Sequence, residues 1–476
     1  MTDVIARLRP LLDRNGIIED DALMARYLVE RRELYHGRTR AVLRPASTAE
    51  VAAIMKIAHE TGTPIVPQGG NTGLVGGQIP FEDGAELVLS LERLNAIRTL
   101  DATNNTMTVE AGVTLATIQQ KAEDAGRLFP LSLASEGTCQ IGGNLSTNAG
   151  GTAVLRYGNA RDLVLGLEVV LADGRIWHGL KGLRKDNTGY DLKHLFMGAE
   201  GTLGIITAAV LKLYPRPRAV ATAFVAVPDV EAAVALLRLA EDMSGGLVST
   251  FELMPRLGLD LCLRHMPGAV DPLTAPSPWY VLVELTSGDN GDLDATLQSL
   301  LERAINLALV SDGAIARSGR QRADFWRLRE DMSDAQRPEG GSIKHDVSVP
   351  VSSVAAFIAE ASAAVEKRLP GIRPVPFGHI GDGNIHFNLT QPIGMDKTAY
   401  LALWDEMNRI VHDIVRRYDG SISAEHGVGR MKRDEIAATK DPVEMELMRT
   451  LKRALDPKNI LNPGKLVLPG KEALPD

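Results

Sequence analysis

Two histidines flank a predicted turn in FGHIGDGNIHFN, residues 377–388, although the chain holds only 10 histidines in 476 residues. The central GDGN has the composition of a turn and the flanking residues favour strands, so the stretch predicts a β-hairpin. With a four-residue loop at 381–384, His379 faces His386, and their Cβ atoms would lie ~5 Å apart. Two imidazoles at that distance can bind one metal ion, and a solvated surface hairpin is the alternative.

A third candidate ligand lies in SISAEHGVGRMK, residues 421–432. Adjacent residues of an extended segment point in opposite directions, so Glu425 and His426 are not expected to bind the same ion. Glu425 is therefore a candidate metal ligand and His426 a candidate base. In the predicted hairpin register Phe377 faces Asn388, which puts Asn388 on the face of the two histidines.

The segment FWRLREDMSDAQRPEGGSIKHDVSVP, residues 325–350, carries groups that can bind a carboxylate. Arg329 and Ser333 are four residues apart and would share one face of a helix. Lys344 begins a stretch that alternates like a strand. A guanidinium, a hydroxyl and an ammonium can together hold a carboxylate, and an ordinary charged helix surface is the alternative.

Three glycine clusters lie in the first half of the chain: PQGGNTGLVGGQIP (67–80), SEGTCQIGGNLSTNAGG (135–151) and GAEGTLGIIT (198–207). Glycine allows the backbone to approach a ligand closely and to present N–H groups to a phosphate. None of the clusters fits the GxGxxG pattern that opens a helix after a strand. They predict either a phosphate-binding region of another kind or turns between short strands.

The elements around these motifs indicate an α+β protein. Ser47 and Glu50 form a capping-box pattern before a helix that Gly62 ends, and the strand PIVP then leads into the first glycine cluster. Strand and helix patterns continue to about residue 218. Two further strand–helix patterns after this point predict a second domain with an antiparallel sheet. From Asp405 onward the sequence reads as mostly helical and closes with the loop LDPKNILNPGKL.

Composition excludes some classes of function. The net charge of -8 and the pI near 5.8 argue against a general nucleic-acid binder. No apolar run approaches the ~20 residues of a membrane span. Two cysteines, Cys139 and Cys262, do not make a disulfide framework, so we expect a reducing, cytoplasmic setting and a packed side chain at Cys139.

The three glycine clusters, in this order, resemble the FAD-binding domain of the vanillyl-alcohol oxidase / p-cresol methylhydroxylase flavoprotein family. PQGGNTGLVGG, LRKDNTGYDL (183–192), HIGDGNIHFN and SAEHGVG resemble, more narrowly, its D-2-hydroxyglutarate dehydrogenase branch, within a wider group of D-lactate and glycolate dehydrogenases. The similarity extends from about residue 35 to the C-terminal NPGKL.

The resemblance implies an FAD-binding domain at 1–218, a substrate or cap domain at 219–420, and a C-terminal segment, 421–476, that packs on the FAD domain and completes the active site. The implied FAD is non-covalent, because Asn71 stands where members with covalent flavin carry a histidine. The implied FAD-binding residues are Gly69, Gly70, Asn71, Thr72, Gly73, Gly137, Thr138, Gly142, Asn144, Thr147, Asn148, Gly150, Gly201 and Ile206.

By the same resemblance His379, His386 and Glu425 bind a divalent metal, usually zinc, and His426 is the base. The implied substrate-binding residues are Arg329, Ser333, Lys344 and Asn388, with serine at 333 where the branch commonly has threonine. The implied reaction is metal-assisted, FAD-dependent oxidation of D-2-hydroxyglutarate to 2-oxoglutarate. D-Lactate or glycolate oxidation, a metallohydrolase and a non-catalytic FAD-binding protein are the alternatives.

The expected partners are a small 2-hydroxy acid and an electron acceptor that the sequence does not identify, either an electron-transfer flavoprotein or a quinone. Nucleic acid is not an expected partner. The oligomeric state is left open, with a homodimer as one option.

Overall fold

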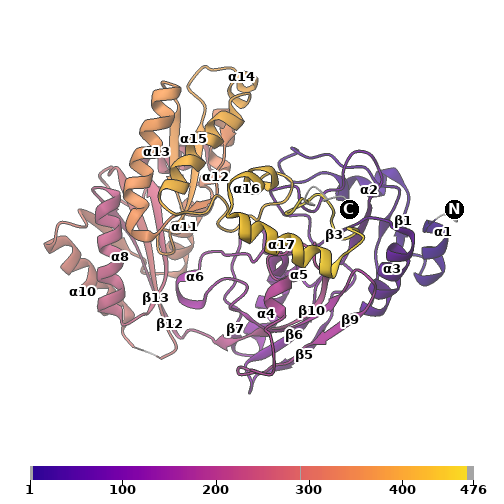
Figure 1. Cartoon of the computed structure of the whole chain (residues 1–476). Coiled ribbons are helices and arrows are strands. Elements are labelled where there is room, and N and C mark those ends of the chain that lie inside the picture. The colour runs from indigo at the N-terminus through magenta and orange to yellow at the C-terminus, as the bar shows by residue number, and fades with distance from the viewer. Residues whose placement is uncertain (1–3, 290, 469–476) are drawn as a thin grey trace. The chain divides into compact units, whose positions relative to one another are not determined.

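The computed structural model describes residues 4–289 and 291–468 (Figure 1). The chain forms two compact units. Unit 1 contains the chain up to Gly151, Asn159–Arg216 and the part from Glu425 onward, and unit 2 contains Thr152–Gly158 and Pro217–Ala424. The yellow C-terminal helices of Figure 1 therefore belong to the same unit as the indigo N-terminal elements.

Unit 1 contains a small mixed sheet, a larger antiparallel sheet and a short strand pair. The mixed sheet has the order β1 (Ile17–Ile18), β2 (Val42–Leu43), β4 (Leu87–Ser90), β3 (Ile65–Gln68). The antiparallel sheet has the order β5 (Ile97–Asp101), β6 (Thr106–Glu110), β10 (Ile205–Lys212), β8 (Val164–Val170), β9 (Ile176–Gly179). The strand pair is β7 (Arg127–Leu128) with β11 (Tyr214–Pro215).

The described helices of unit 1 are α1 (Val4–Leu8), η1 (Arg9–Leu11), α2 (Asp21–Leu28), α3 (Thr48–Thr61), α4 (Leu115–Asp124), α5 (Ile141–Ser146), α7 (Lys193–Phe196), α16 (Arg433–Thr439) and α17 (Pro442–Leu455).

Helix α3 forms as its sequence predicts. The Ser47 side chain accepts the N–H of Glu50 at 3.2 Å, and Gly62 ends the helix in the left-handed region at φ 66°. Its apolar face, which includes Ile54, packs into the core beneath the mixed sheet. Strand β3 follows, so the first glycine cluster leaves this sheet from the end of a buried strand.

Unit 2 is α+β with antiparallel strands, which confirms the prediction for this part of the chain. One sheet has the order β13 (Val248–Pro255), β14 (Trp279–Ser287), β12 (Ala219–Val227), β15 (Asp312–Ile315). In the other, β16 (Ser342–Ile343), β17 (Val347–Ser348) and β18 (Arg373–Phe377) all pair with β19 (Asn384–Thr390).

The described helices of unit 2 are α6 (Val154–Tyr157), α8 (Val230–Ser244), α9 (Arg256–His265), α10 (Leu293–Asn306), α11 (Gly319–Glu330), α12 (Met332–Ala335), η2 (Arg337–Glu339), η3 (Val351–Ser353), α13 (Val354–Arg368), α14 (Lys397–Leu401) and α15 (Trp404–Arg417). Helices α8 and α10 lie side by side against the first sheet (Figure 1). Rings of Phe224, Tyr280 and Phe325 meet in the core between β12, β14 and α11.

The predicted hairpin exists, but its predicted register is wrong. Phe377, and not His379, is opposite His386, and Val375 is opposite Asn388. The connection spans residues 378–383 because Gly378 exchanges both backbone hydrogen bonds with Leu253 of β13, at 2.9 and 3.1 Å. This pairing removes Gly378 from the ladder with β19, so His379 lies in the connection and not in a strand.

None of the described helices is long and apolar enough to cross a membrane.

Candidate active site

The glycine clusters of unit 1 line one pocket, with about 840 Å³ of empty space when the solvent at its mouth is included. Its lining includes residues of all three clusters, among them Gly69, Gly143 and Gly201, and also His426. A Cβ on Gly143 would meet nothing within 4 Å, whereas one on Gly70 would come within 2.0 Å of the Thr138 carbonyl oxygen. The glycines therefore serve both to pack the loops against each other and to leave backbone accessible in the pocket.

Four buried amide side chains of the pocket lining have an unpartnered oxygen: Gln68, Gln140, Asn144 and Asn462. Buried polar groups without a partner are rare in proteins, because each costs about 1–3 kcal/mol. Four of them around one pocket indicate that its occupant is a large polar molecule with hydrogen-bonding groups along its length.

Most of the predicted cofactor-binding residues lie in this pocket. The lining includes Gly69, Gly70, Asn71, Thr72, Gly73, Gly142, Asn144, Thr147, Gly201 and Ile206. Four predicted residues are not part of it: Gly137, Thr138, Asn148 and Gly150. Sequence reasoning missed Gln68 and Gln140, although both stand within the quoted glycine clusters, and it missed Asn462, whose position in the sequence carries no signal.

The side chain of Asn71 is used for structure. Its Nδ2 donates to the carbonyl oxygens of Arg26 and Val29, each at 2.9 Å, and its Oδ1 accepts from Gln78 at 3.1 Å. The residue adopts a left-handed backbone with φ 55°. Asn71 therefore anchors the first glycine loop to the end of α2, and its amide has no nucleophilic atom to offer a flavin.

Glu200 holds the loop that carries His426. Its carboxylate accepts the N–H groups of Val428 and Gly429 at 2.7 and 2.8 Å. Burial raises the pKa of the Glu200 carboxyl, although both backbone N–H groups act in the opposite direction. Because these bonds form within three residues of His426, they fix the backbone that presents this imidazole to the pocket.

Glu425 lies half-buried and accepts the N–H of Gly151 at 2.9 Å through Oε2. The residue before it, Ala424, donates its N–H to the carbonyl oxygen of Asp346 at 3.2 Å. Ala424 is therefore hydrogen-bonded to the backbone of Asp346, and Glu425 is the next residue in the chain.

Strand β19 carries His386 and Asn388 on one face of its sheet. Ile343 is opposite Leu389 and Val347 is opposite Ile385, so the segment between β16 and β17 keeps a single register along β19. By this register Asp346 is opposite His386 and Lys344 is opposite Asn388, and opposed residues point to the same side. Four polar side chains thus gather on this face.

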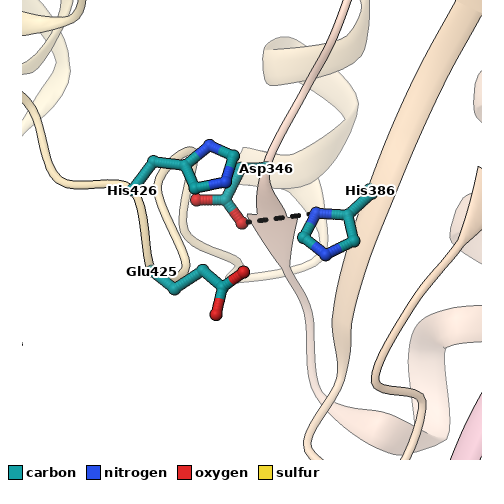
Figure 2. Close-up of side chains that lie close together, drawn as sticks. All are labelled: Asp346, His386, Glu425 and His426. Carbon is teal, nitrogen blue, oxygen red and sulfur yellow. Dashed lines mark ion pairs between the residues drawn. The ribbon is translucent and has the colours of Figure 1, made fainter. Parts of the chain in front are cut away.

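Figure 2 draws Asp346 and His386 with the contact between them, 3.9 Å from carboxylate oxygen to Nδ1. Asp346 is 1% exposed and also accepts from the Asn384 amide at 3.0 Å. The figure also labels Glu425 and His426, which follow Ala424 in the chain, and all four residues are candidate metal ligands by type. Sequence reasoning missed Asp346, although it stands two residues after Lys344 in an alternating segment.

His379 is bound to a different carboxylate. Its Nδ1 lies 2.6 Å from Oε1 of Glu252, and Oε2 of Glu252 accepts the Nε–H of Arg329 at 2.6 Å. Burial alone would raise the pKa of Glu252, but its interactions with His379 and Arg329 lower it to about 2. The rings of His379 and His386 have centroids 5.5 Å apart despite the changed register.

The other predicted substrate-binding residues are partly paired with each other. Lys344 Nζ donates to the Ser333 hydroxyl at 2.6 Å and to its carbonyl oxygen at 3.1 Å. Ser333 is on α12, beyond the break at Asp331 that separates it from Arg329 on α11. Asn388 is 2% exposed. The side chain of Cys139 is buried, as expected for a packed residue.

Comparisons with known proteins identify both halves of the chain. Residues 39–179 match a family described as "FAD binding domain", and residues 216–466 match "FAD linked oxidases, C-terminal domain". A protein of Oryza sativa subsp. indica named "Probable D-2-hydroxyglutarate dehydrogenase, mitochondrial" is 39% identical over 462 residues, 97% of this chain and 81% of that protein. The D-2-hydroxyglutarate dehydrogenase of Bos taurus, also named mitochondrial, is 39% identical over 89% of this chain and 76% of that protein.

These names contradict the expected cytoplasmic localisation, since the plant and animal relatives are named mitochondrial. A relative from the bacterium Xanthomonas citri pv. viticola, 38% identical over 88% of both chains, has no compartment in its name. The expectation failed because a low cysteine content excludes only a disulfide framework and does not distinguish one reducing compartment from another.

The crystal structure of p-cresol methylhydroxylase with substrate bound has the same fold, with a TM-score of 0.77, 18% identity, and coverage of 98% of this chain and 97% of that chain. This likeness confirms the predicted fold class, a flavin-binding domain of vanillyl-alcohol oxidase type with a second domain built on antiparallel sheet. The family matches also decide for a flavoenzyme over a metallohydrolase. The chain belongs to the D-2-hydroxyglutarate dehydrogenase branch of the vanillyl-alcohol oxidase / p-cresol methylhydroxylase family and is an FAD-dependent 2-hydroxy-acid dehydrogenase.

Proposed function

We propose that this chain oxidises D-2-hydroxyglutarate to 2-oxoglutarate, with the hydride passing to N5 of a non-covalent FAD and with assistance from a divalent metal, zinc. The observation that carries the proposal is the lining of one pocket by glycine loops, unpartnered amides and His426. An imidazole there is suited to take a hydroxyl proton near neutral pH. The names of the relatives support the choice of substrate.

The residues of the pocket fit FAD. The first glycine loop, Gly69 to Gly73, would hold the pyrophosphate, and the predicted residues of the other two clusters that line the pocket would approach the ribityl chain and the ring system. The unpartnered oxygens of Gln68, Gln140 and Asn462 offer acceptors for the hydroxyl and ring N–H groups that FAD carries. Since Asn71 stands where a histidine would bind flavin covalently and its amide has no nucleophilic atom, the cofactor is expected to dissociate on denaturation.

The candidate ligands fit a metal such as zinc, which prefers imidazole nitrogen and carboxylate oxygen. His379, His386 and Glu425 would hold the ion, and Asp346 is a fourth candidate that lies opposite His386. Donation from Nδ1 of His379 to Glu252 leaves a lone pair at Nε2, which is the state in which imidazole binds a metal. When bound, FAD supplies the hydride acceptor and the metal lowers the pKa of a coordinated hydroxyl.

The substrate carboxylates have separate candidate partners. Lys344 and Asn388 face each other across the strands, so both can bind one carboxylate, with Ser333 beside Lys344. Arg329 uses Nε for Glu252 and still carries N–H groups on both Nη atoms for the second carboxylate. His426 would take the hydroxyl proton. D-Lactate and glycolate have one carboxylate each and would leave the Nη–H groups of Arg329 without the second carboxylate as acceptor, which costs about 1–3 kcal/mol.

The proposal is tested by anaerobic mixing of the purified protein with D- and L-2-hydroxyglutarate, D-lactate and glycolate while the flavin absorbance is followed. We expect D-2-hydroxyglutarate to bleach the flavin with an efficiency at least about 100-fold above that of D-lactate. Equal or better bleaching by D-lactate or glycolate would favour those substrates. A protein without flavin absorbance, or with a flavin that no 2-hydroxy acid reduces, would refute the flavin mechanism.

Removal of the metal tests the second part of the proposal. Dialysis against a chelator should abolish flavin reduction while the flavin stays bound, and added Zn²⁺ should restore it, since the proposed ligands are not residues of the flavin pocket. Full activity of a demonstrably metal-free protein would contradict the ligand assignment.

The division into an FAD domain at 1–218, a substrate domain at 219–420 and a completing segment at 421–476 is part of the same proposal. The electron acceptor stays a prediction, as either an electron-transfer flavoprotein or a quinone. A homodimeric assembly also stays a prediction.

A further inference from the structure

Glu252 is a buried carboxylate that binds neither flavin, metal nor substrate in the proposed mechanism. It stands on β13 between Phe251 and Leu253, and only 1% of it is exposed. An ionised carboxylate in such surroundings is costly unless it is paired and fully hydrogen-bonded. The two oxygens of Glu252 must therefore have strong partners.

The partners come from two different elements. Oε1 lies 2.6 Å from Nδ1 of His379, and Oε2 accepts the Nε–H of Arg329 at 2.6 Å. Both partners are buried, and the Arg329 guanidinium also lies over the Phe377 ring, 4.9 Å from its centroid. One carboxylate therefore holds a proposed metal ligand and a proposed substrate-binding residue at the same time.

The position of His379 explains why it needs such an anchor. It lies in the 378–383 connection, so no regular ladder sets the direction of its side chain. The neighbouring Gly378 is already paired with Leu253, the residue after Glu252, which brings the connection against β13. A carboxylate that accepts from Nδ1 then sets both the ring orientation and the tautomer, with the lone pair at Nε2.

The bond to Arg329 acts in the same way on the guanidinium. Arg329 is at the C-terminal end of α11, and its long side chain would otherwise sample several rotamers. Contact at Nε and stacking on Phe377 set the plane of the group, and the Nη edge then has a defined direction for a planar carboxylate.

Glu284 offers a matched comparison. It is 5% exposed on β14, next to β13, and binds Arg322 of the same helix α11 at 2.6 and 2.9 Å. Its further partners are Trp326, whose Nε1 donates at 3.1 Å, and Thr222, whose hydroxyl donates at 2.8 Å. Arg322 and Arg329 are two helical turns apart, so both glutamates receive an arginine from one helix face. Only Glu252 has a histidine of the proposed metal site as its second partner.

We propose that Glu252 is a positioning residue that orients His379 for the metal and Arg329 for the substrate carboxylate, and so couples the two binding sites. This inference rests on the proposed function.

The test compares E252Q with E284Q, each purified with FAD. For E252Q we expect metal affinity, measured by chelator competition, to fall about 10–100-fold. At saturating metal its KM for D-2-hydroxyglutarate should rise about 10-fold, since Arg329 is no longer oriented. E284Q should lower the thermal stability about as much as E252Q does. It should leave the metal affinity and KM within about two-fold of wild type, because the partners of Glu284 are outside both sites.

A double-mutant cycle separates positioning from general damage. If Glu252 acts on the metal through His379, adding E252Q to H379A should lower metal affinity no further. Should E252Q fail to fold, E252D replaces it, because the shorter side chain keeps the charge but cannot reach both partners. We expect E252D to lower the metal affinity and raise KM as E252Q does, but by smaller factors.

A folded E252Q with wild-type metal affinity and KM overturns the inference, as does an equal loss in E284Q or an additive effect in the cycle. The proposed function is judged on the wild type alone. Wild type that binds no metal, or whose flavin is not reduced by any 2-hydroxy acid, refutes the proposed function itself. Wild type that passes both tests while E252Q behaves normally refutes only the role of Glu252.

Discussion

The buried glutamates Glu200 and Glu252 differ in what compensates their charge. Glu252 has Arg329 and His379 as partners, and they outweigh burial and lower its pKa to about 2. Glu200 receives two backbone N–H groups, which do not outweigh burial, so its pKa is raised. The first arrangement orients side chains, and the second orients the backbone that carries His426.

The role of His426 gives a prediction for a single residue. H426A should keep FAD and metal but slow anaerobic flavin reduction by about 10²–10⁴-fold, because the hydroxyl proton loses its acceptor. Stopped-flow absorbance measures the rate of flavin reduction. The control is H36A, which changes an exposed histidine that is distant from His426 in the sequence. A rate for H426A equal to that of the control would exclude His426 as the base.

The resemblance to a known family led to ten residues of the pocket lining, but sequence reasoning missed the two carboxylates that hold His379, His386 and Arg329. Loops such as QGGNTG are recognised by composition, because a close backbone approach requires glycine. Glu252 in its strand and Asp346 between β16 and β17 carry no comparable signal, since a single acid acquires its meaning from the partners that the fold brings to it.

Among the elements, β19 organises the polar face of the second sheet of unit 2. It pairs with β16, β17 and β18, and its central residues His386 and Asn388 therefore have neighbours on both sides. The connection before it depends on glycine at both ends, with φ 147° at Gly378 and 81° at Gly383. The histidines in and after the connection owe their placement to these glycines.

Replacing Gly383 tests this dependence. In G383A the new Cβ would come within 2.1 Å of the Val349 carbonyl oxygen, in addition to the strain of a positive φ. We expect G383A to lose about 1–3 kcal/mol more stability than G394A, where φ is 78° and nothing lies within 4 Å. Thermal unfolding compares the two, and equal losses would show that the close approach at Val349 relaxes at little cost.

At the scale of the whole molecule, a few buried or partly buried ion pairs join elements that are distant in sequence. Glu339 of η2 binds Arg373 of β18 at 2.5 Å, and His265 and Arg264 of α9 at 2.6 and 3.0 Å. Its side chain is 12% exposed, so water screens these contacts only in part. The cluster connects three elements of unit 2.

This cluster predicts a particular pH dependence of stability. Arg373 and then His265 lower the pKa of Glu339 to about 2, whereas a glutamate in the unfolded chain titrates near ~4.3. The stabilisation is therefore complete above ~pH 5 and is lost as the pH falls toward 2. We expect E339Q to be about 1–3 kcal/mol less stable than wild type at pH 6, with a gap that narrows between pH 5 and 3. Urea-unfolding midpoints of the two proteins measure this stability difference. A difference that stays constant as the pH falls would contradict the stabilising role of ionised Glu339.

The resemblance to a known family predicted the fold class and ten of the residues that line the pocket. From local patterns alone the sequence determined the helix caps, the strand that feeds the first glycine loop and the glycine loops themselves. These features depend on local chemistry: Ser47 caps a helix wherever it stands, and the glycine loops keep their composition in any register. The resemblance of the same motifs to a known family also led to the correct class of enzyme.

Only the tertiary structure decided which groups meet. It moved His379 out of the hairpin ladder because Gly378 pairs with Leu253 instead, a contact between residues 125 positions apart in the chain. It also brought Glu252 to Arg329 and Asp346 to His386. Local periodicity cannot encode such pairings, because hydrogen bonds and ion pairs across strands depend on the register that the packed sheets adopt.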